Sequence, residues 1–301
     1  MISLKQIILT VNSSVQISDK NQGINKALAI TDVNFNENSI GWCSDNNSHL
    51  IENIHTGNVI VSNELYAKKS VKSSDLVLIP VENPRQAFQK ILQAFFYEKP
   101  VFGVISQSAL IHETVLYNAT KVSIGPNVVI EKGCEIGSNV VIGANTVIKS
   151  DTIIQNECTI GSNCTIGGVG FGYELNENNE YELMPHIGNV LILSNVEIGN
   201  NVCIDKAVMG STIIGEHVKI DNLVHIAHGV EIGRNSLIIA NAMIAGSVKI
   251  GENVWVAPSA SVRQKLEIGD DSIIGLGSVV VKNVNTNTTV AGNPAKEFPK
   301  K

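Results

Sequence analysis

The chain has 301 residues, enough for a substantial core and for two or three folded units. Its formal net charge is −6 with no block of like charge, which argues against nucleic acid or an anionic membrane as a partner. No apolar run approaches the ~20 residues of a membrane span, and residues 1–6 lack a secretory signal pattern, so we expect a cytoplasmic protein without a membrane span.

Residues 1–103 are expected to form a small α/β domain. Short apolar runs predict strands near Gln6–Thr10, Asn58–Ser62 and Leu76–Pro80. A helix should open at Asn83-Pro84, because proline suits the first helical position. Its apolar residues follow the 3.6-residue period and should dock on the sheet: Ala87, Phe88, Ile91, Leu92 and Phe95.

Residues 104–285 carry a six-residue repeat that no helix or flat sheet produces. The aliphatic positions are Ile124, Ile130, Ile136, Ile142, Ile148, Ile154, Ile160, Ile166, Ile192, Ile198, Ile204, Ile214, Ile220, Ile226, Ile232, Ile238, Ile244, Ile250, Val256, Val262, Ile268, Ile274 and Val280. Two residues before many of them stands a small or β-branched residue: Val122, Val128, Cys134, Val140, Thr146, Thr152, Cys158, Cys164, Thr212, Val218, Val224 and Val230.

Each repeat predicts one short strand and one bend, because residues i−2 and i share a face of an extended segment. Gly and Asn after the inward residue, as in Ile136-Gly-Ser-Asn, should take positive φ at the corner. Three sides close a coil of 18 residues, and coils stack about 4.8 Å apart. The sequence therefore predicts an all-β parallel β-helix. A chance match in a Val/Ile-rich sandwich is the alternative, which more than twenty positions in register argue against.

The cysteines of the repeat, Cys134, Cys158 and Cys164, occupy the inward i−2 column, where we expect them to fill the core. Cys158 and Cys164 are six residues apart and should lie on successive sides of a coil. We therefore predict neither a disulfide nor a zinc site from them.

Two interruptions and an ending break the repeat. Residues 167–191 form the larger insertion, which begins Gly-Gly-Val-Gly-Phe-Gly-Tyr and should lie as a loop on one face. The ten-residue step from Ile204 to Ile214 is a smaller bulge. Residues 286–301 are expected to form a C-terminal cap.

The densest polar cluster runs from Asp221 to Gly229. Because Ile226 should point inward, His225 and His228 should point outward, where an imidazole can take a proton from an attacking amine. Asp221 or Asn222 could hold the tautomer. Two alternatives stay open: a solvated pair of corner histidines, or zinc bound by three histidines across a subunit interface. Since no third ligand is evident, we predict no metal.

Several short sequence motifs, spread over most of the chain, resemble the UDP-3-O-acylglucosamine N-acyltransferase family. They are Ile40-Gly41-Trp42, Asn83-Pro84-Arg85-Gln86-Ala87-Phe88, Gly170-Phe171-Gly172, Pro185-His186-Ile187-Gly188, Ile204-Asp205-Lys206, Lys219-Ile220-Asp221-Asn222, Ile226-Ala227-His228 and Ile244-Ala245-Gly246-Ser247. The resemblance implies a left-handed β-helix, an exception to the usual right-handed crossover. It also implies a nucleotide-binding amino-terminal domain and a homotrimer.

By this resemblance His228 is the base that deprotonates a sugar amine, which then attacks a thioester. Gly246 lies one coil later, where its backbone N–H would hold the oxyanion. Asp221 and Asn222 would orient the base or bind sugar. Further substrate-binding residues would be Trp42, Phe171, Tyr173, His186 and His225.

Three features depart from that family. Lys265 stands where a second active-site histidine is expected, and Ser48 falls near the place of the aromatic partner of Trp42. The third is the ending at Lys301, without a helical extension that helps bind acyl carrier protein.

The ending instead resembles hexapeptide-repeat sugar acetyltransferases that use acetyl-CoA. That resemblance, together with the lysine charge, predicts a CoA site at Lys265, Gly275, Gly277, Lys282, Asn293, Pro294, Ala295 and Lys296; a surface cap with scattered lysines is the alternative.

We therefore predict an N-acyltransferase that moves a short acyl group, acetyl first, from acyl-CoA to the amine of a UDP- or dTDP-linked amino sugar for cell-surface polysaccharide synthesis. One rival prediction is the lipid A enzyme itself, which takes a hydroxyacyl chain from acyl carrier protein. Another is a noncatalytic β-helix that binds a nucleotide sugar.

Overall fold

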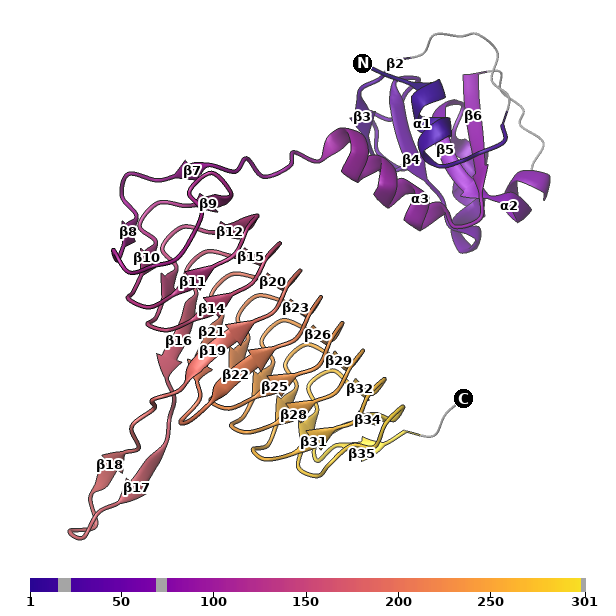
Figure 1. Ribbon diagram of the computed structural model, residues 1–301. Helices are drawn as coiled ribbons and strands as arrows, with labels where there is room; N and C mark the ends of the chain where they lie inside the picture. The colour runs from indigo at the N-terminus through magenta and orange to yellow at the C-terminus, as the bar shows by residue number, and fades with distance from the viewer. Residues whose placement is uncertain (16–22, 69–74, 299–301) are drawn as a thin grey trace. The chain divides into compact units, whose positions relative to one another are not determined.

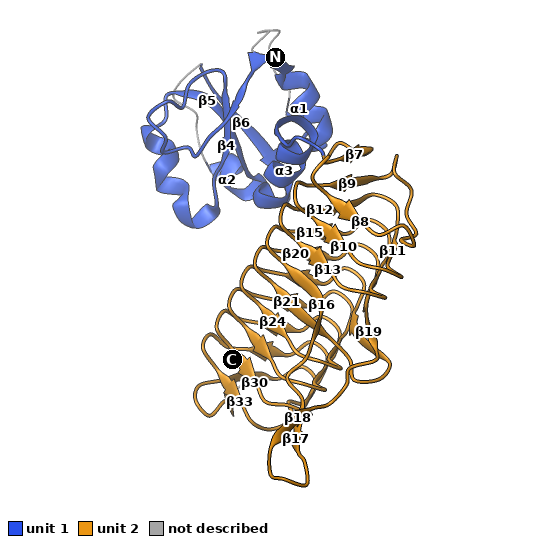
Figure 2. Cartoon of the chain, turned by 90° about the vertical axis from the view of Figure 1, so that its left-hand side faces the viewer, with its two compact units in different colours: residues 1–99 blue, residues 100–301 orange. Residues whose placement is uncertain are grey.

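A computed structural model describes residues 1–15, 23–68 and 75–298. The chain divides into two compact units, residues 1–99 and 100–301, which Figure 2 shows in separate colours. Among the described residues, no helix is both long and apolar enough to cross a membrane.

Unit 1 is built on a parallel sheet of four strands in the order β3-β4-β5-β6. The described strands of unit 1 are β1 (Ile2–Ser3) and β2 (Gly23–Ile24), which form a separate antiparallel pair, and β3 (Lys26–Ala27), β4 (Ser39–Trp42), β5 (Thr56–Ser62) and β6 (Asp75–Val81), which form the sheet. Its helices are α1 (Leu4–Thr10), the 3₁₀ helix η1 (Asp45–Asn53), α2 (Asn63–Lys68), α3 (Pro84–Ile91) and the π-helix η2 (Leu92–Phe96). The predicted strands at β5 and β6 are thereby confirmed.

The predicted helix after β6 is also confirmed. Asn83 caps α3 by accepting a hydrogen bond from Gln86 N at 3.1 Å, and Pro84 occupies the first turn. Ala87 and Ile91 are buried with sheet residues in one of the two core clusters of this unit. The helix therefore docks on the sheet through the face that its periodicity predicts.

The predicted strand at Gln6–Thr10 is wrong, because these residues lie in helix α1. Ser3 Oγ accepts from Gln6 N at 3.2 Å, and Ser3 N donates to Gln6 Oε1 at 2.9 Å. This capping box satisfies two backbone donors at the start of the helix. Leu4, Ile7 and Ile8 then share one buried face. Ser3 followed three residues later by Gln6 is a sequence signal for the start of a helix, and it outweighs the apolar run that predicts a strand.

Unit 2 is a parallel β-helix whose coils run side by side along one axis (Figure 1). The nine-stranded side holds β8 (Leu110–Ile111), β10 (Val129–Ile130), β13 (Val147–Ile148), β16 (Thr165–Val169), β21 (Cys203–Lys206), β24 (His225–Ile226), β27 (Met243–Ile244), β30 (Ser261–Val262) and β33 (Val279–Val280). The seven-stranded side holds β11 (Glu135–Ile136), β14 (Ile153–Ile154), β19 (Asn189–Ile192), β22 (Ser211–Ile214), β25 (Glu231–Ile232), β28 (Lys249–Ile250) and β31 (Glu267–Ile268).

The third side has eleven strands and reaches past the predicted boundary at residue 285. It holds β7 (Val104–Ile105), β9 (Val122–Ile124), β12 (Val140–Ile142), β15 (Thr159–Ile160), β20 (Glu197–Ile198), β23 (Lys219–Ile220), β26 (Leu237–Ile238), β29 (Trp255–Val256), β32 (Ile273–Ile274), β34 (Thr289–Ala291) and β35 (Lys296–Glu297). β34 pairs in parallel with β32, and β35 turns back antiparallel on β34. The coil ladder therefore ends within the segment predicted as a cap.

The inward columns of the repeat form one continuous core. Every aliphatic repeat position from Ile124 to Val280 is buried, as is each i−2 residue named above. Strands one coil apart pair in exact register with the period, so that Ile130 lies opposite Ile148. Cys134, Cys158 and Cys164 are buried free thiols in this core, as predicted.

The corners correct the expected role of glycine. At these corners positive φ falls on the third residue after the inward one, as at Asn139 (φ 59°) and Asn145 (φ 60°), and not on the glycine that directly follows it, Gly137 or Gly143. A Cβ on Gly137 would lie 2.7 Å from the backbone carbon of Gln155 in the next coil. Glycine is required there because successive coils approach closely at the corner.

The Ile142→Ala variant should lower the free energy of unfolding by about 2–5 kcal/mol, because Ile142 is 1% exposed and the rigid coils cannot collapse onto the cavity. Urea unfolding followed by circular dichroism measures the change. Val141→Ala, which removes an outward side chain from the same strand, is the matched control and should cost less than about 1 kcal/mol. Equal losses in the two variants would contradict the inward assignment.

The insertion folds as an antiparallel hairpin that stands out from the coils (Figures 1 and 2). Its strands are β17 (Tyr173–Leu175) and β18 (Tyr181–Leu183). At its base the pairing of β16 with β21 shifts register between Ile166 and Gly168. This irregularity lets the chain leave the coil and return without interrupting the core.

Candidate active site

His228 lies at the corner that follows β24. Ile226 is fully buried, so His225 and His228 point outward, as the repeat predicts. The side chain of His225 is 45% exposed. His225 lies within β24, whereas His228 lies in the turn after it, so their side chains have different neighbours.

Gly246 occupies the same corner one coil later. Ser247 N donates to His228 O at 2.9 Å, which fixes the spacing of the two coils. A Cβ on Gly246 would lie 2.7 Å from both Cε1 and Nε2 of His228. Within the described part of the chain, Gly246 N–H has no recorded acceptor. The Gly246 backbone therefore lies against the Cε1 and Nε2 atoms of His228. The roles of these residues as base and oxyanion donor stay a prediction.

His186 contacts His228 from the insertion. The two rings are 5.3 Å apart between centroids at an angle of 83°. His186 is 6% exposed, and its Nδ1 lies 2.7 Å from Met184 O. Because a carbonyl only accepts, Nδ1 carries a proton and donates it. His186 Nε2 is buried without a partner among the described residues, a loss of about 1–3 kcal/mol when nothing compensates it.

Asp205 is the acidic residue of this cluster, and the sequence assigned it no role. Its Oδ2 lies 3.7 Å from His225 Nε2. Burial raises the pKa of Asp205, while positive charge on His225 or His186 would lower it. The sequence motif Ile204-Asp205-Lys206 is one of those that carry the family resemblance. Residue spacing does not predict that Asp205 lies close to a histidine of another coil.

Asp221 and Asn222 lie at a different corner, after β23. Asp221 Oδ1 accepts from Asn222 N at 2.7 Å, and Asp221 Oδ2 accepts from Ala240 N at 3.2 Å. Asn222 Oδ1 accepts from Asn200 N at 2.7 Å. No contact of either side chain with His228 is recorded among the described residues. The two side chains therefore brace stacked corners, and the acid beside the outward histidines is Asp205.

The pKa of His228 lies below its ordinary value of 6.5, chiefly because burial disfavours the charged ring and secondly because charge on His186 would repel it. The neutral ring therefore predominates at pH 7. We expect the proton NMR signal of His228 Cε1–H to titrate with a midpoint below pH 6.5, and the base to be lost as pH falls through that midpoint. A midpoint at or above 6.5 would contradict this environment. The signal is assigned with His228→Gln.

The predicted aromatic substrate contacts fall in both units. Phe171 and Tyr173 form a tilted pair with ring centroids 4.9 Å apart at the base of the hairpin, and Phe171 is 87% exposed. Trp42 ends β4 and is half-buried against the core cluster of unit 1. Ligand binding by these residues stays a prediction.

The predicted CoA residues occupy the last coils. Lys265 N donates to Gly246 O at 3.0 Å, so its backbone stacks directly on the coil of Gly246. The Lys265, Lys282 and Lys296 side chains are exposed. Gly275 packs against Ala291, where a Cβ would approach the Ala291 Cβ to 2.8 Å, and Gly277 has a φ of 62°. The Asn293-Pro294 bond is cis, and Ala295 N donates to Val279 O at 2.8 Å.

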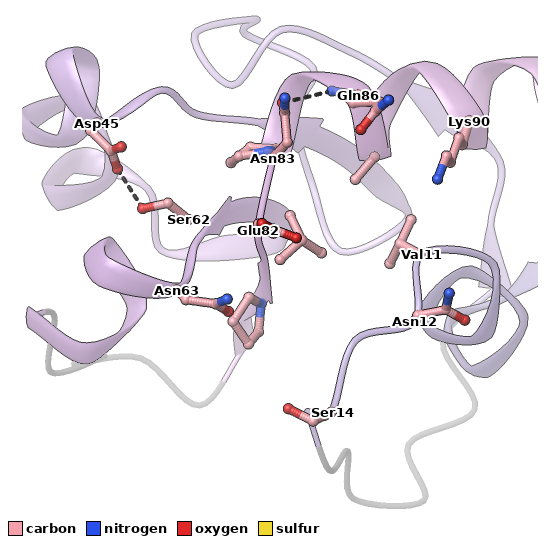
Figure 3. Close-up of a pocket in the computed structure, with 14 residues that line it drawn as sticks. Val11, Asn12, Ser14, Asp45, Ser62, Asn63, Glu82, Asn83, Gln86 and Lys90 are labelled. Atoms are coloured by element: carbon pink, nitrogen blue, oxygen red, sulfur yellow. Dashed lines mark hydrogen bonds between the residues drawn. The ribbon is translucent and has the colours of Figure 1, made fainter.

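Unit 1 has its own polar cavity of about 740 Å³ where β5 and β6 end and α3 begins (Figure 3). Asp45 accepts a hydrogen bond from Ser62 Oγ at 2.5 Å on one wall. Among the described residues, its lining includes two carboxylates, Asp45 and Glu82, and one cation, Lys90. Trp42 is not among the described residues that line this cavity.

Comparison with known proteins links unit 2 to acyltransferases. A sequence model described as bacterial transferase hexapeptide (six repeats) matches residues 121–150 and 211–246. UDP-3-O-acylglucosamine N-acyltransferase 1 of Francisella tularensis subsp. holarctica is 37% identical over 215 residues, 65% of this chain and 61% of that protein. The Legionella pneumophila protein of the same name is 40% identical over 214 residues, 65% of this chain and 59% of that protein.

A solved structure shares the coil. The UDP-N-acetylglucosamine acyltransferase from Campylobacter jejuni superposes with a TM-score of 0.58 at 25% identity, over 64% of this chain and 73% of that one. The predicted left-handed parallel β-helix with a small amino-terminal α/β domain is confirmed, as is the resemblance to UDP-3-O-acylglucosamine N-acyltransferases. The chain spans only 61% and 59% of the length of these two curated relatives.

Proposed function

We propose that the protein is an N-acyltransferase that joins an acyl group from a thioester to the amine of a nucleotide-linked amino sugar. The observation that carries the proposal is the close approach of the Gly246 backbone to His228 Nε2, together with a Gly246 N–H that has no acceptor among the described residues, in a coil that resembles acyltransferases. A base next to an oxyanion donor is the minimum that acyl transfer from a thioester requires, because the thioester is already activated.

The proposed reaction proceeds without a covalent enzyme intermediate. His228 Nε2 takes a proton from the amine while the amine nitrogen bonds to the thioester carbonyl carbon. The carbonyl oxygen becomes an oxyanion held by Gly246 N–H. The carbon–sulfur bond then breaks, and the leaving thiolate receives the proton from His228, which leaves an amide and a free thiol. The depressed pKa of His228 favours this role, because the ring is neutral when the amine arrives.

For the substrates, the names of the curated relatives favour a UDP-linked 3-O-acylglucosamine over the acetyl acceptor predicted from the ending. We therefore propose UDP-3-O-acylglucosamine as acceptor and a hydroxyacyl chain on acyl carrier protein as donor. Acetyl-CoA is the second candidate donor, supported by the turn between β34 and β35, where Lys296 pairs with Ala291, and by the exposed side chains of Lys282 and Lys296 in the last coils.

We also propose that the protein is a homotrimer and that it is cytoplasmic. Support for assembly comes from the hairpin, which exposes several large apolar side chains: Phe171, Leu175, Tyr181 and Ile187 are at least 56% exposed. Monomeric proteins rarely expose so many together, so a partner surface is expected to cover them. Light scattering should give three times the 32.3 kDa chain mass.

Thiol release tests the proposal directly. Purified protein is incubated with acetyl-CoA or with hydroxyacyl carrier protein, each with a panel of UDP- and dTDP-linked amino sugars. Release that requires both the carrier protein and UDP-3-O-acylglucosamine, with the amide seen by mass spectrometry, supports the proposal. Release only from acetyl-CoA supports the second donor. No release with any pair, from protein that still binds a UDP sugar, would leave the noncatalytic alternative.

A further inference from the structure

We propose that His186 is a positioning residue that holds the His228 imidazole with Nε2 toward Gly246 and stabilises the imidazolium formed when His228 takes a proton. This inference rests on the proposed function only for its kinetic consequence. The contact between the two rings, and its effect on the charge of His228, can be measured in the resting protein.

The first step of the argument is that His186 is itself fixed. Its Nδ1–H donates to Met184 O at 2.7 Å, two residues earlier in the chain. Met184 N in turn donates to Gly172 O at 2.8 Å, across the two arms of the insertion. The ring plane and the tautomer of His186 are therefore set by the neck of the hairpin, and a rigid group can orient a neighbour.

The second step is to establish which side of the His228 ring faces His186. A Cβ on Gly170 would lie 2.8 Å from His186 Nε2, 2.9 Å from His228 Cβ and 3.0 Å from His228 Cδ2. Gly246 instead approaches Cε1 and Nε2 of the same ring. His228 is thus held between two backbones, with His186 on the Cβ and Cδ2 side and the oxyanion donor at the reactive nitrogen.

The third step is electrostatic. With its proton on Nδ1, a neutral His186 carries a lone pair on Nε2 that is buried and has no donor among the described residues. The rings meet edge to face at 83°, and the C–H edge of His228 becomes more positive when that ring is protonated. The contact therefore strengthens only after proton transfer, and such differential stabilisation raises kcat more than it changes KM.

The fourth step concerns the other charges at the site. Asp205 on β21 and His225 on β24 are the other titratable groups at this site. They lie 3.7 Å apart, and Asp205 also interacts electrostatically with His186. A protonated His186 would repel the His228 imidazolium and lower the pKa of His228. A neutral His186 would instead offer the Nε2 lone pair to it. The sign of the effect on His228 therefore reports which form of His186 is present.

The test compares His186→Phe, which keeps ring volume but lacks the lone pair, with His186→Gln, which restores an acceptor near the position of Nε2. We expect the Phe variant to lose about 10- to 100-fold in kcat with KM changed less than about 3-fold, and Gln to recover part of the loss. By NMR, the His228 midpoint should move to lower pH in the Phe variant and return toward wild type in Gln. Glu182→Gln, a charge change on the hairpin, is the control for the insertion.

Several outcomes would overturn the inference. An unchanged or raised His228 midpoint in His186→Phe would mean that the contact is only packing or is repulsive. A wild-type kcat in that variant, from an enzyme that is active, would remove the positioning role and leave the proposed function intact. If wild type catalyses none of the tested reactions, the proposed function fails and the NMR midpoint alone decides the inference. If Phe does not fold, His186→Leu, which also lacks the lone pair, takes its place: a lowered His228 midpoint supports the inference, and an unchanged or raised midpoint overturns it.

Discussion

The His228→Ala variant should lose about 10²- to 10⁴-fold in kcat/KM for amide formation, the range for removal of a general base. The reason is that, among the described residues, the ring that approaches Gly246 is His228, whereas His186 Nε2 is buried and His225 is paired with Asp205. His228→Gln should behave alike, because an amide cannot carry the proton to the leaving thiolate. Initial-rate kinetics with the active donor and acceptor pair measure the loss.

The matched control for that variant is His217→Asn. His217 is also a corner histidine, with φ 59°, a conformation that asparagine adopts at many other corners of this coil. We expect wild-type activity from it. Both variants should unfold within about 1 kcal/mol of wild type, because both side chains lie outside the buried columns. Retained activity in His228→Ala, or equal loss in the control, would reject His228 as the base.

The Gly246→Ala variant should lose about 10²- to 10³-fold in kcat, similar to the loss of one oxyanion donor. Its new Cβ would fall 2.7 Å from His228 Nε2 and Cε1, closer than carbon and nitrogen approach without a bond. Either the ring turns away or the coil shifts, and in both cases the base and the donor lose their shared geometry. Stopped-flow measurement of a single turnover separates this effect from product release.

Gly168→Ala is the control for added volume. Its Cβ would meet the nearest atoms at 3.5 and 3.6 Å, which is ordinary van der Waals contact. We expect its activity to stay within about threefold of wild type. If Gly246→Ala shows the same small change, then the close approach of Gly246 to His228 does not matter for the reaction.

The regular part of the fold followed from sequence because its interactions are periodic. An inward residue such as Ile130 pairs with the residue 18 positions later, Ile148, so a short period in the chain specifies every coil contact. The helix after β6 followed for a similar local reason, since Asn83 and Pro84 form its cap from adjacent residues. The structure differs from the expectation at two places: the capping box at Ser3 begins a helix, and the corner glycines are required by the close approach of the neighbouring coil.

The sequence by itself therefore determined the β-helix, its inward columns, and the outward position of His228 one coil before Gly246, because each depends on spacing along a repeat. Only the tertiary structure decided what surrounds that base. His186 and Gly170 reach it through an insertion that has no repeat, and Asp205 pairs with Gly168 where the register of β16 and β21 shifts and lies 3.7 Å from His225. Contacts across an irregular segment depend on the path of the folded backbone, and no period in the chain encodes that path.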